Sequence, residues 1–191
     1  MNCSLSSIGQ EITIIPFFGQ DTLKLDHYYP FGNDSIRISK FKMYVSFNDQ
    51  PLLWSADKWS ETQLDYSSQN ELHILAIGVD SLLCSSGEFT EDLDPIEGMY
   101  WAWQSGYVNF KLEGNSNLCD TRKNAFTFHI GGYVYPNNAF RSFEIDCSNG
   151  SLILDISNYF KEIDLSVQNH VMSPGKDAQR IADKFENLFL K

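Results

Sequence analysis

The stretch "SKFKMYVSF" (residues 39–47) alternates polar and apolar side chains with a period of two. In an extended chain, the apolar residues Phe41, Met43, Val45 and Phe47 would all lie on one face. The opposite face would carry mostly lysine, tyrosine and serine side chains. This pattern predicts a strand with one face in a core and the other in solvent, which is typical of antiparallel sheets.

Similar runs recur along the chain. They are EITIIPFF (11–18), SIRISK (35–40), GYVNFKLEG (106–114), AFTFHI (125–130), RSFEIDC (141–147) and SLILDIS (151–157). The turn-forming sequences "NDS", "NG" and "YPNN" separate some of them. We therefore predict an all-β fold, an antiparallel β-sandwich of the immunoglobulin-like or jelly-roll-like kind.

The C-terminal sequence "SPGKDAQRIADKFENLFLK" (173–191) changes to a helical period. Its apolar positions share one helical face: Ala178, Ile181, Ala182, Phe185, Leu188 and Phe189. Ser173 is suited to the N-cap and Pro174 to the first helical position. We predict an amphipathic helix over 174–190 that docks on the sandwich, because its polar face mixes both charges and is not basic like a membrane-binding face.

The length of 191 residues predicts one domain, which we place at 21–191 after an N-terminal segment, 1–20. No run approaches the roughly 20 apolar residues of a membrane helix. The start lacks the basic and apolar regions of a signal peptide, which leaves a cytosolic protein or one whose signal has been removed. Cys3, next to the initiator Met, fits the anchor cysteine of a trimmed lipoprotein.

The formal net charge is −11, with only 14 Lys and Arg spread along the chain. Phosphate backbones need clustered cations, so this charge argues against a nucleic-acid partner. The excess of carboxylates is compatible with solubility, a cationic ligand or a basic protein partner.

Four cysteines occupy positions 3, 84, 119 and 147 without the CxxC spacing of a zinc site. Cys119 and Cys147 flank a segment that we interpret as strand, turn and strand, so a disulfide would close a hairpin there in an oxidising compartment. Free buried thiols are the alternative.

Carboxylates gather between residues 80 and 97. Such a loop could hold Ca²⁺, although it lacks the ligand spacing of an EF-hand. For Asp80 and Asp94, capping of backbone amides in a turn is the other interpretation.

The sequence "GMYWAWQSGY" (98–107) concentrates aromatic residues between two glycines. If it is extended, Met99, Trp101 and Trp103 share one face, and Tyr100 takes the other. One interpretation of such a run is core packing, and the other is a functional site that uses its aromatic side chains.

Four segments together resemble a known family: "AIGVDSLLCSSG" (76–87), "LDPIEGMYWAWQSGYVNFKLEG" (93–114), "FHIGGY" (128–133) and "VMSPGKDAQRIADKF" (171–185). Their order and wording are similar to the MbnP-like family of periplasmic proteins, named for a partner encoded in methanobactin operons. The resemblance runs from about Leu23 to the C-terminus.

This resemblance implies an exported β-sandwich associated with copper. It also implies a dihaem peroxidase partner of the MauG-like type, which oxidises a tryptophan to kynurenine. Trp101 and Trp103 are then the candidates for modification, with Met99, Tyr100 and Tyr107 lining the site. An intact indole has no in-plane lone pair to offer a metal, whereas kynurenine carries an amine and a carbonyl.

The candidate copper ligands are His129, His170 and Met172. In an extended segment His170 and Met172 point the same way, and imidazole with thioether is a donor set that copper accepts. We therefore expect a non-enzymatic, monomeric copper-binding protein of the periplasm or cell surface. The alternative is an extracytoplasmic module that binds a carbohydrate or a surface protein through an aromatic platform; no hydrolase motif is present.

Overall fold

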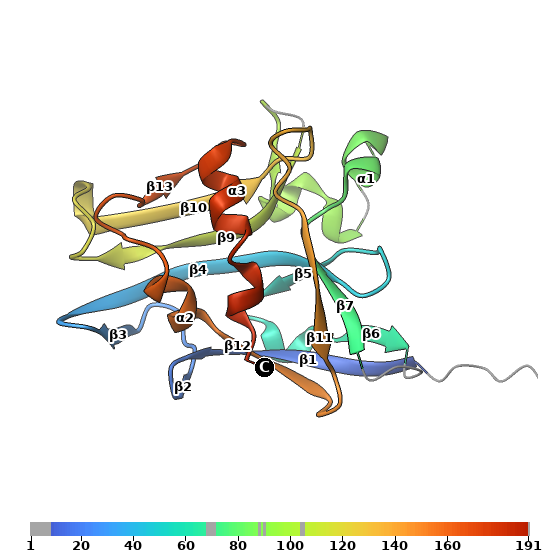
Figure 1. Ribbon diagram of the computed structural model, residues 1–191, viewed down its shortest axis with the longest axis horizontal. Helices are drawn as coiled ribbons and strands as arrows, with labels where there is room; N and C mark the ends of the chain where they lie inside the picture. Colours follow the sequence, from blue (N-terminus) through green and yellow to red (C-terminus); the bar gives the residue numbers. More distant parts are fainter. Residues whose placement is uncertain (1–8, 68–71, 88, 90, 104–105, 191) are drawn as a thin grey trace, which may run out of the picture.

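The computed structural model describes residues 9–67, 72–87, 89, 91–103 and 106–190, and each of the predicted runs contains a strand or part of one (Figure 1). The larger sheet contains β3 (Tyr28–Phe31), β4 (Asp34–Ser46), β5 (Leu52–Ser55), β7 (Leu72–Ile77), β8 (Tyr100–Trp101), β9 (Gly106–Ser116), β10 (Ala125–Gly131), β11 (Arg141–Asp146) and β13 (His170–Val171). The smaller sheet contains β1 (Gly9–Phe18), β2 (Asp21–Thr22), β6 (Leu64–Ser67) and β12 (Ser151–Asp155).

The larger sheet has the order β11-β7-β4-β9-β10-β13, with β3 and β5 also paired to β4 and β8 paired to β9. The long strands β4 and β9 form its centre, in a register that sets Phe41 opposite Leu112 and Met43 opposite Phe110. These four residues are buried, as their alternation predicts. The β-sandwich prediction is confirmed, with a strongly curled larger sheet.

Two pairings differ from the antiparallel arrangement that we predicted. β1 runs parallel to β12, and β10 runs parallel to β13. The predicted boundary at residue 20 also differs from the structure, because β1 is a central strand of the smaller sheet with Ile12 and Ile14 fully buried. The sandwich therefore begins at least as early as residue 9.

The core between the sheets is mostly aromatic. Trp54 on β5 is fully buried, packs edge-on against Phe41 with ring centroids 5.1 Å apart, and donates from Nε1 to the Ile14 carbonyl at 3.2 Å. Since Ile14 lies on β1, this bond ties the larger sheet to the smaller one. Asp155 accepts from the backbone N–H groups of Gly19 and Ser157, which satisfies a buried carboxylate and caps α2 (Ile156–Lys161).

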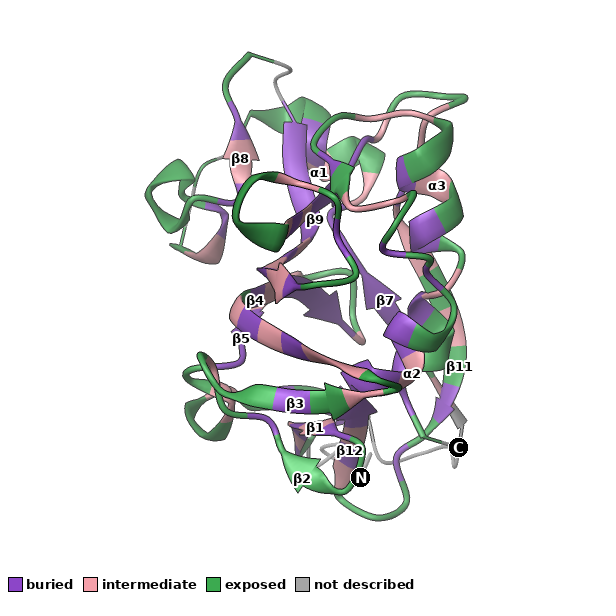
Figure 2. Ribbon diagram, turned by 90° about the vertical axis from the view of Figure 1, so that its left-hand side faces the viewer, coloured by how far each residue is buried: buried purple, intermediate pink, exposed green. Residues whose placement is uncertain are grey.

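Strand β9 is covered on both faces over its first half, unlike the half-solvated strand that we predicted (Figure 2). The covering segment contains α1 (Ser81–Ser86) and the short 3₁₀ turns η2 (Glu91–Leu93) and η3 (Pro95–Glu97). Its apolar residues make a second core cluster with the outer face of the sheet: Tyr44, Val79, Cys84, Leu93, Met99, Trp101, Tyr107 and Val108.

The C-terminal helix is shorter than predicted. α3 spans Lys176–Ala182 and is followed by the 3₁₀ turn η5 (Phe185–Leu188), and extended Gly175 takes the N-cap position expected for Ser173. The predicted apolar face is confirmed, since all six of its residues are buried. α3 docks on β10, and the Phe185 ring lies 4.9 Å from that of Phe110. None of the helices in the described residues is long and apolar enough to cross a membrane.

The hairpin predicted between Cys119 and Cys147 is wrong. β10 pairs with β9 and β13, whereas β11 lies at the far end of the sheet and pairs with β7. Both cysteines are buried free thiols, so no bridge joins them. Burial raises the pKa of the Cys147 thiol to about 11, which keeps it protonated and unreactive at neutral pH.

Candidate functional site

The aromatic stretch 98–107 forms a tight hairpin. Strand β8 pairs with the start of β9, so that Tyr100 faces Tyr107 and Trp101 faces Gly106. The Val108 N–H donates to the Met99 carbonyl at 2.8 Å and extends this pairing. Residues 102 and 103 begin the turn, and Gln104 and Ser105 lie outside the described residues.

The turn separates the two tryptophans that we expected on one face. Trp101 is 7% exposed and Met99 is fully buried, but Trp103 is 65% exposed. The two indoles still touch, with ring centroids 5.7 Å apart and planes inclined by 43°. The hairpin thus presents one indole to solvent and holds the other beneath it.

Trp101 is held by a close approach of β10. A Cβ on Gly131 would lie 2.9 Å from Cζ3 of Trp101 and 2.2 Å from the carbonyl oxygen of Tyr107, so no larger residue fits there. The pairing of β9 and β10 shifts at Gly131, where the chain turns away toward Tyr133.

A hollow of about 250 Å³ opens beside Trp101, which we call the Trp101 pocket. Its other walls are Gly106 and the 132–137 loop with Pro174. Tyr135 on this loop is 91% exposed, and the aromatic residues that line the pocket are Trp101, Tyr133 and Tyr135. Pro174 also lines a second, polar hollow of about 260 Å³ that contains His170 and Met172.

Below the hairpin, three tyrosines pack edge to face. The ring of Tyr107 lies 5.1 Å from Tyr100 and 5.7 Å from Tyr44. The Tyr107 hydroxyl donates to the Leu93 carbonyl at 3.2 Å, and that of Tyr44 donates to the Asp92 carbonyl at 3.0 Å. Burial raises the pKa of Tyr107 to about 12, so its hydroxyl is uncharged at neutral pH.

Asp80 and Asp94 are backbone caps. Asp80 accepts from the N–H groups of Leu82 and Leu83 at the start of α1, and Asp94 accepts from that of Ile96 at the start of η3. The capping interpretation is therefore confirmed for both residues. Neither is part of a group of three or more His, Cys, Asp or Glu suited to a metal, because the described residues contain none.

Two of the candidate copper ligands lie on strands, His129 on β10 and His170 on β13, and Met172 directly follows β13. His170 is opposite Thr127 in the parallel pairing, two residues before His129 on β10. His129 is largely buried, and its Nε2 lies 2.8 Å from Oε1 of Glu113 on β9. Burial lowers the pKa of His129 despite the opposing effect of Glu113.

His170 and Met172 are open to solvent instead. His170 is exposed, Met172 is 38% exposed, and both line the polar hollow that shares Pro174 with the Trp101 pocket. The structure thus brings His170 and Met172 together and leaves His129 hydrogen-bonded to Glu113.

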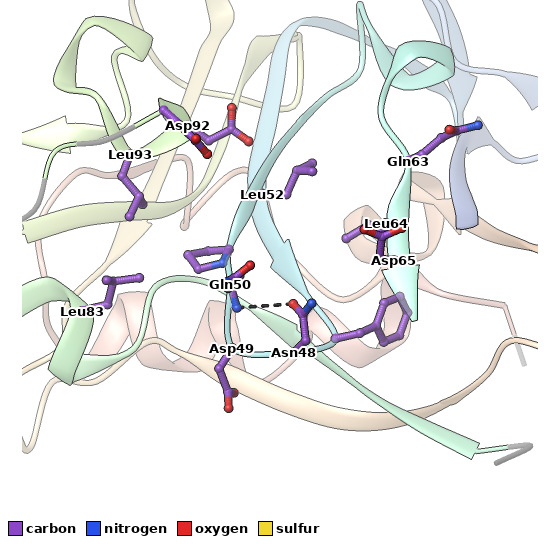
Figure 3. Close-up of a pocket in the computed structure, with 13 residues that line it drawn as sticks. Asn48, Asp49, Gln50, Leu52, Gln63, Leu64, Asp65, Leu83, Asp92 and Leu93 are labelled. Atoms are coloured by element: carbon purple, nitrogen blue, oxygen red, sulfur yellow. Dashed lines mark hydrogen bonds between the residues drawn. The ribbon is translucent and has the colours of Figure 1, made fainter. Parts of the chain in front are cut away.

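A further hollow, of about 370 Å³, lies at the turn after β4, where we predicted no site from the sequence (Figure 3). Asp92, Leu83 and Leu93 border one side, and Gln63, Leu64 and Asp65 border the other. The Asp92 carboxylate accepts from the Leu53 N–H at 2.9 Å, so it anchors η2 to β5. The excess of carboxylates at 91–94 is the only sequence signal that pointed near it.

Both the sequence and the fold of this chain are similar to those of known proteins. The family model named MbnP matches residues 61–173, more than half of the chain. The structure is similar to that of MbnP from Methylosinus trichosporium, with a TM-score of 0.62 and 11% sequence identity over 90% of this chain and 83% of that one. At this identity the structural likeness shows the fold alone. No curated protein matches the chain.

Proposed function

We propose, from the premise that the chain belongs to the MbnP family, that it is a copper-binding, non-enzymatic protein of the periplasm or cell surface. In this proposal, a tryptophan of the 98–107 hairpin is oxidised to kynurenine by a dihaem peroxidase partner. The observation that carries the proposal is the ring contact between exposed Trp103 and buried Trp101, which lines the Trp101 pocket.

The exposed indole gives a partner enzyme access. Trp103 is the exposed one of the pair, so a partner enzyme can reach its ring directly. Trp101 lies in ring contact with it, so an oxidising equivalent reaching Trp103 has a short route to the second indole. Either ring therefore remains a candidate for modification.

The chemistry balances with hydrogen peroxide as the oxidant. Two molecules of peroxide cleave the indole C2–C3 bond, insert two oxygen atoms to form N-formylkynurenine and leave as two molecules of water. Hydrolysis then releases formate and frees the aniline amine. The side chain gains one oxygen and loses one carbon, and it acquires a nitrogen donor that an intact indole lacks.

The side-chain donors available in the described residues are of types that copper accepts, but they are too few to complete a copper site. His170 and Met172 offer an imidazole and a soft thioether, which copper accepts. His129 is engaged by Glu113, and the described residues form no group of three or more His, Cys, Asp or Glu for a metal. A donor created by oxidation would add to His170 and Met172, since both the hairpin and these residues border Pro174.

The test is intact mass with metal analysis on protein from its own host's envelope, beside protein from a host without the peroxidase. We expect a gain of one oxygen minus one carbon on the peptide with Trp101 and Trp103, together with bound copper, only in the first. The double variant His170→Ala, Met172→Ala should lose most copper, while His27→Ala, at an exposed histidine elsewhere, should keep it. An unmodified mass without copper in native protein would reject the proposal.

A recognition module is the second candidate function. Trp103 and Tyr135 are 65% and 91% exposed beside the Trp101 pocket, which favours stacking of a carbohydrate or a partner's side chain. Copper-free, unmodified protein should then bind such a ligand with a change in tryptophan fluorescence. Tyr135→Ala should weaken that binding, whereas Tyr28→Ala, at an exposed tyrosine on β3, should not.

A further inference from the structure

A groove of about 770 Å³ opens between β11, β12 and the C-terminal residues, within the range of roughly 300–1,000 Å³ typical of ligand sites. β11 ends the larger sheet and β12 ends the smaller one. Figure 1 shows the two strands diverging from the turn that joins them. Among the described residues they do not pair with each other.

Both strands therefore present an edge to the groove. β11 pairs with β7 on one side, and no described residue pairs with its other side. The outer edge of β12 holds a single antiparallel bridge, between Leu154 and Phe189, and the Leu190 N–H donates to the Ile153 carbonyl at 3.1 Å. Unpaired strand edges are templates for an added strand.

Side chains along β11, which forms one wall of the groove, alternate between apolar and acidic. Phe143 and Ile145 on β11 point toward the core, where Leu152 and Phe189 are also buried. Glu144 on the same strand points to solvent. The remaining carboxylates at the groove are those of Asp146 and Glu186, and among the described residues its lining contains no Lys, Arg or His.

We propose that this groove binds an extended segment of another protein in which Lys or Arg alternates with apolar residues, and that the segment pairs with the free edge of β11. Its basic side chains would lie opposite Glu144 and Asp146, where opposite charges on neighbouring strands stabilise a pair. Its apolar side chains would pack on Phe143 and Ile145. Strand addition of this kind takes affinity from main-chain hydrogen bonds and specificity from alternate side chains.

The probe is a synthetic peptide of about eight residues that alternates Lys and Val, long enough at about 3.3 Å per residue to cover β11. We expect it to bind, to shift the backbone amide NMR signals of Ser142, Glu144 and Asp146, and to bind more weakly at high salt. Its Glu–Val counterpart should not bind. The double variant Glu144→Lys, Asp146→Lys should weaken binding at least about tenfold, because it replaces two attractive pairs by repulsive ones.

The matched control is Asp21→Lys, Asp120→Lys, which changes net charge equally at exposed carboxylates outside the groove. It should bind the peptide nearly as the parent does, and circular dichroism confirms that each variant folds. Should Glu144→Lys, Asp146→Lys fail to fold, Glu144→Gln, Asp146→Asn takes its place.

Three outcomes would overturn the proposal. The first is no binding by the parent protein, or equal loss in both charge-reversed variants. The second is undiminished binding of a Lys–Val peptide that is methylated on every backbone nitrogen, which has no N–H left to donate to the edge of β11. The third is a dimer of the peptide-free protein that Glu144→Lys, Asp146→Lys dissociates, which would assign the groove to a second copy of this chain.

Discussion

Replacing each hairpin tryptophan by alanine should lower the free energy of unfolding by different amounts, because one indole is packed and the other is exposed. Trp101 is 7% exposed and wedged against Gly131, so Trp101→Ala removes a buried aromatic side chain and leaves a cavity. Such changes cost about 3–5 kcal/mol of unfolding free energy. Trp103 is 65% exposed, and its main loss is the ring contact with Trp101, worth about 0.5–1.5 kcal/mol. The two variants should therefore differ by at least about 1.5 kcal/mol.

The assay is urea unfolding followed by far-ultraviolet circular dichroism, because tryptophan fluorescence would itself change with the mutations. The proteins are made in a host without a dihaem peroxidase, so that both indoles are intact. Equal slopes with denaturant would show that the same surface is exposed on unfolding. A loss for Trp103→Ala as large as that for Trp101→Ala would refute the reasoning, since it would mean that the outer indole is also packed.

Three further changes test the scaffold. Trp54→Phe should cost at least about 1–3 kcal/mol in urea unfolding, because the buried Ile14 carbonyl loses its donor. Asp80→Ala should cost about 0.5–2 kcal/mol as the α1 cap is lost, and Asp80→Asn less. The pKa values of His129 and Glu113 are both lowered in the fold, so the unfolded chain binds more protons in acid and stability should fall from about pH 6.5 downward. His129→Gln should flatten the upper part of that fall; an unchanged pH profile of unfolding would contradict it.

Local periodicity was sufficient to place β1, β4, β9, β10, β11 and β12, but not the other strands. The alternation in β4 and β9 lies within a few consecutive residues, and burial of Phe41, Met43, Phe110 and Leu112 follows from it directly. The helix face at 178–189 was predictable for the same reason, although its division into α3 and η5 was not. The alternation of polar and apolar residues in a segment depends only on its own sequence, so it can be recognised without knowledge of the rest of the fold.

Strand partners could not be predicted in this way. The segment between β10 and β11 is nine residues long, too long for a turn type to fix a hairpin, and β11 pairs with β7 instead. The burial of the outer face of β9 could not be predicted either, because residues such as Tyr107 and Asn109 occur on both solvent-exposed and buried faces of strands. Only the packing of residues 79–101 above them makes that face a second core.

The hairpin shows why an assumption of extended geometry misplaced part of the candidate site. Period-two reasoning put Met99, Trp101 and Trp103 on one face, but the turn that joins β8 to β9 begins immediately after Trp101. The turn instead leaves the two indoles in contact, with Trp101 packed against Gly131 and Trp103 exposed. Position in the turn, and not the period of the strand, therefore decides which tryptophan is exposed to solvent.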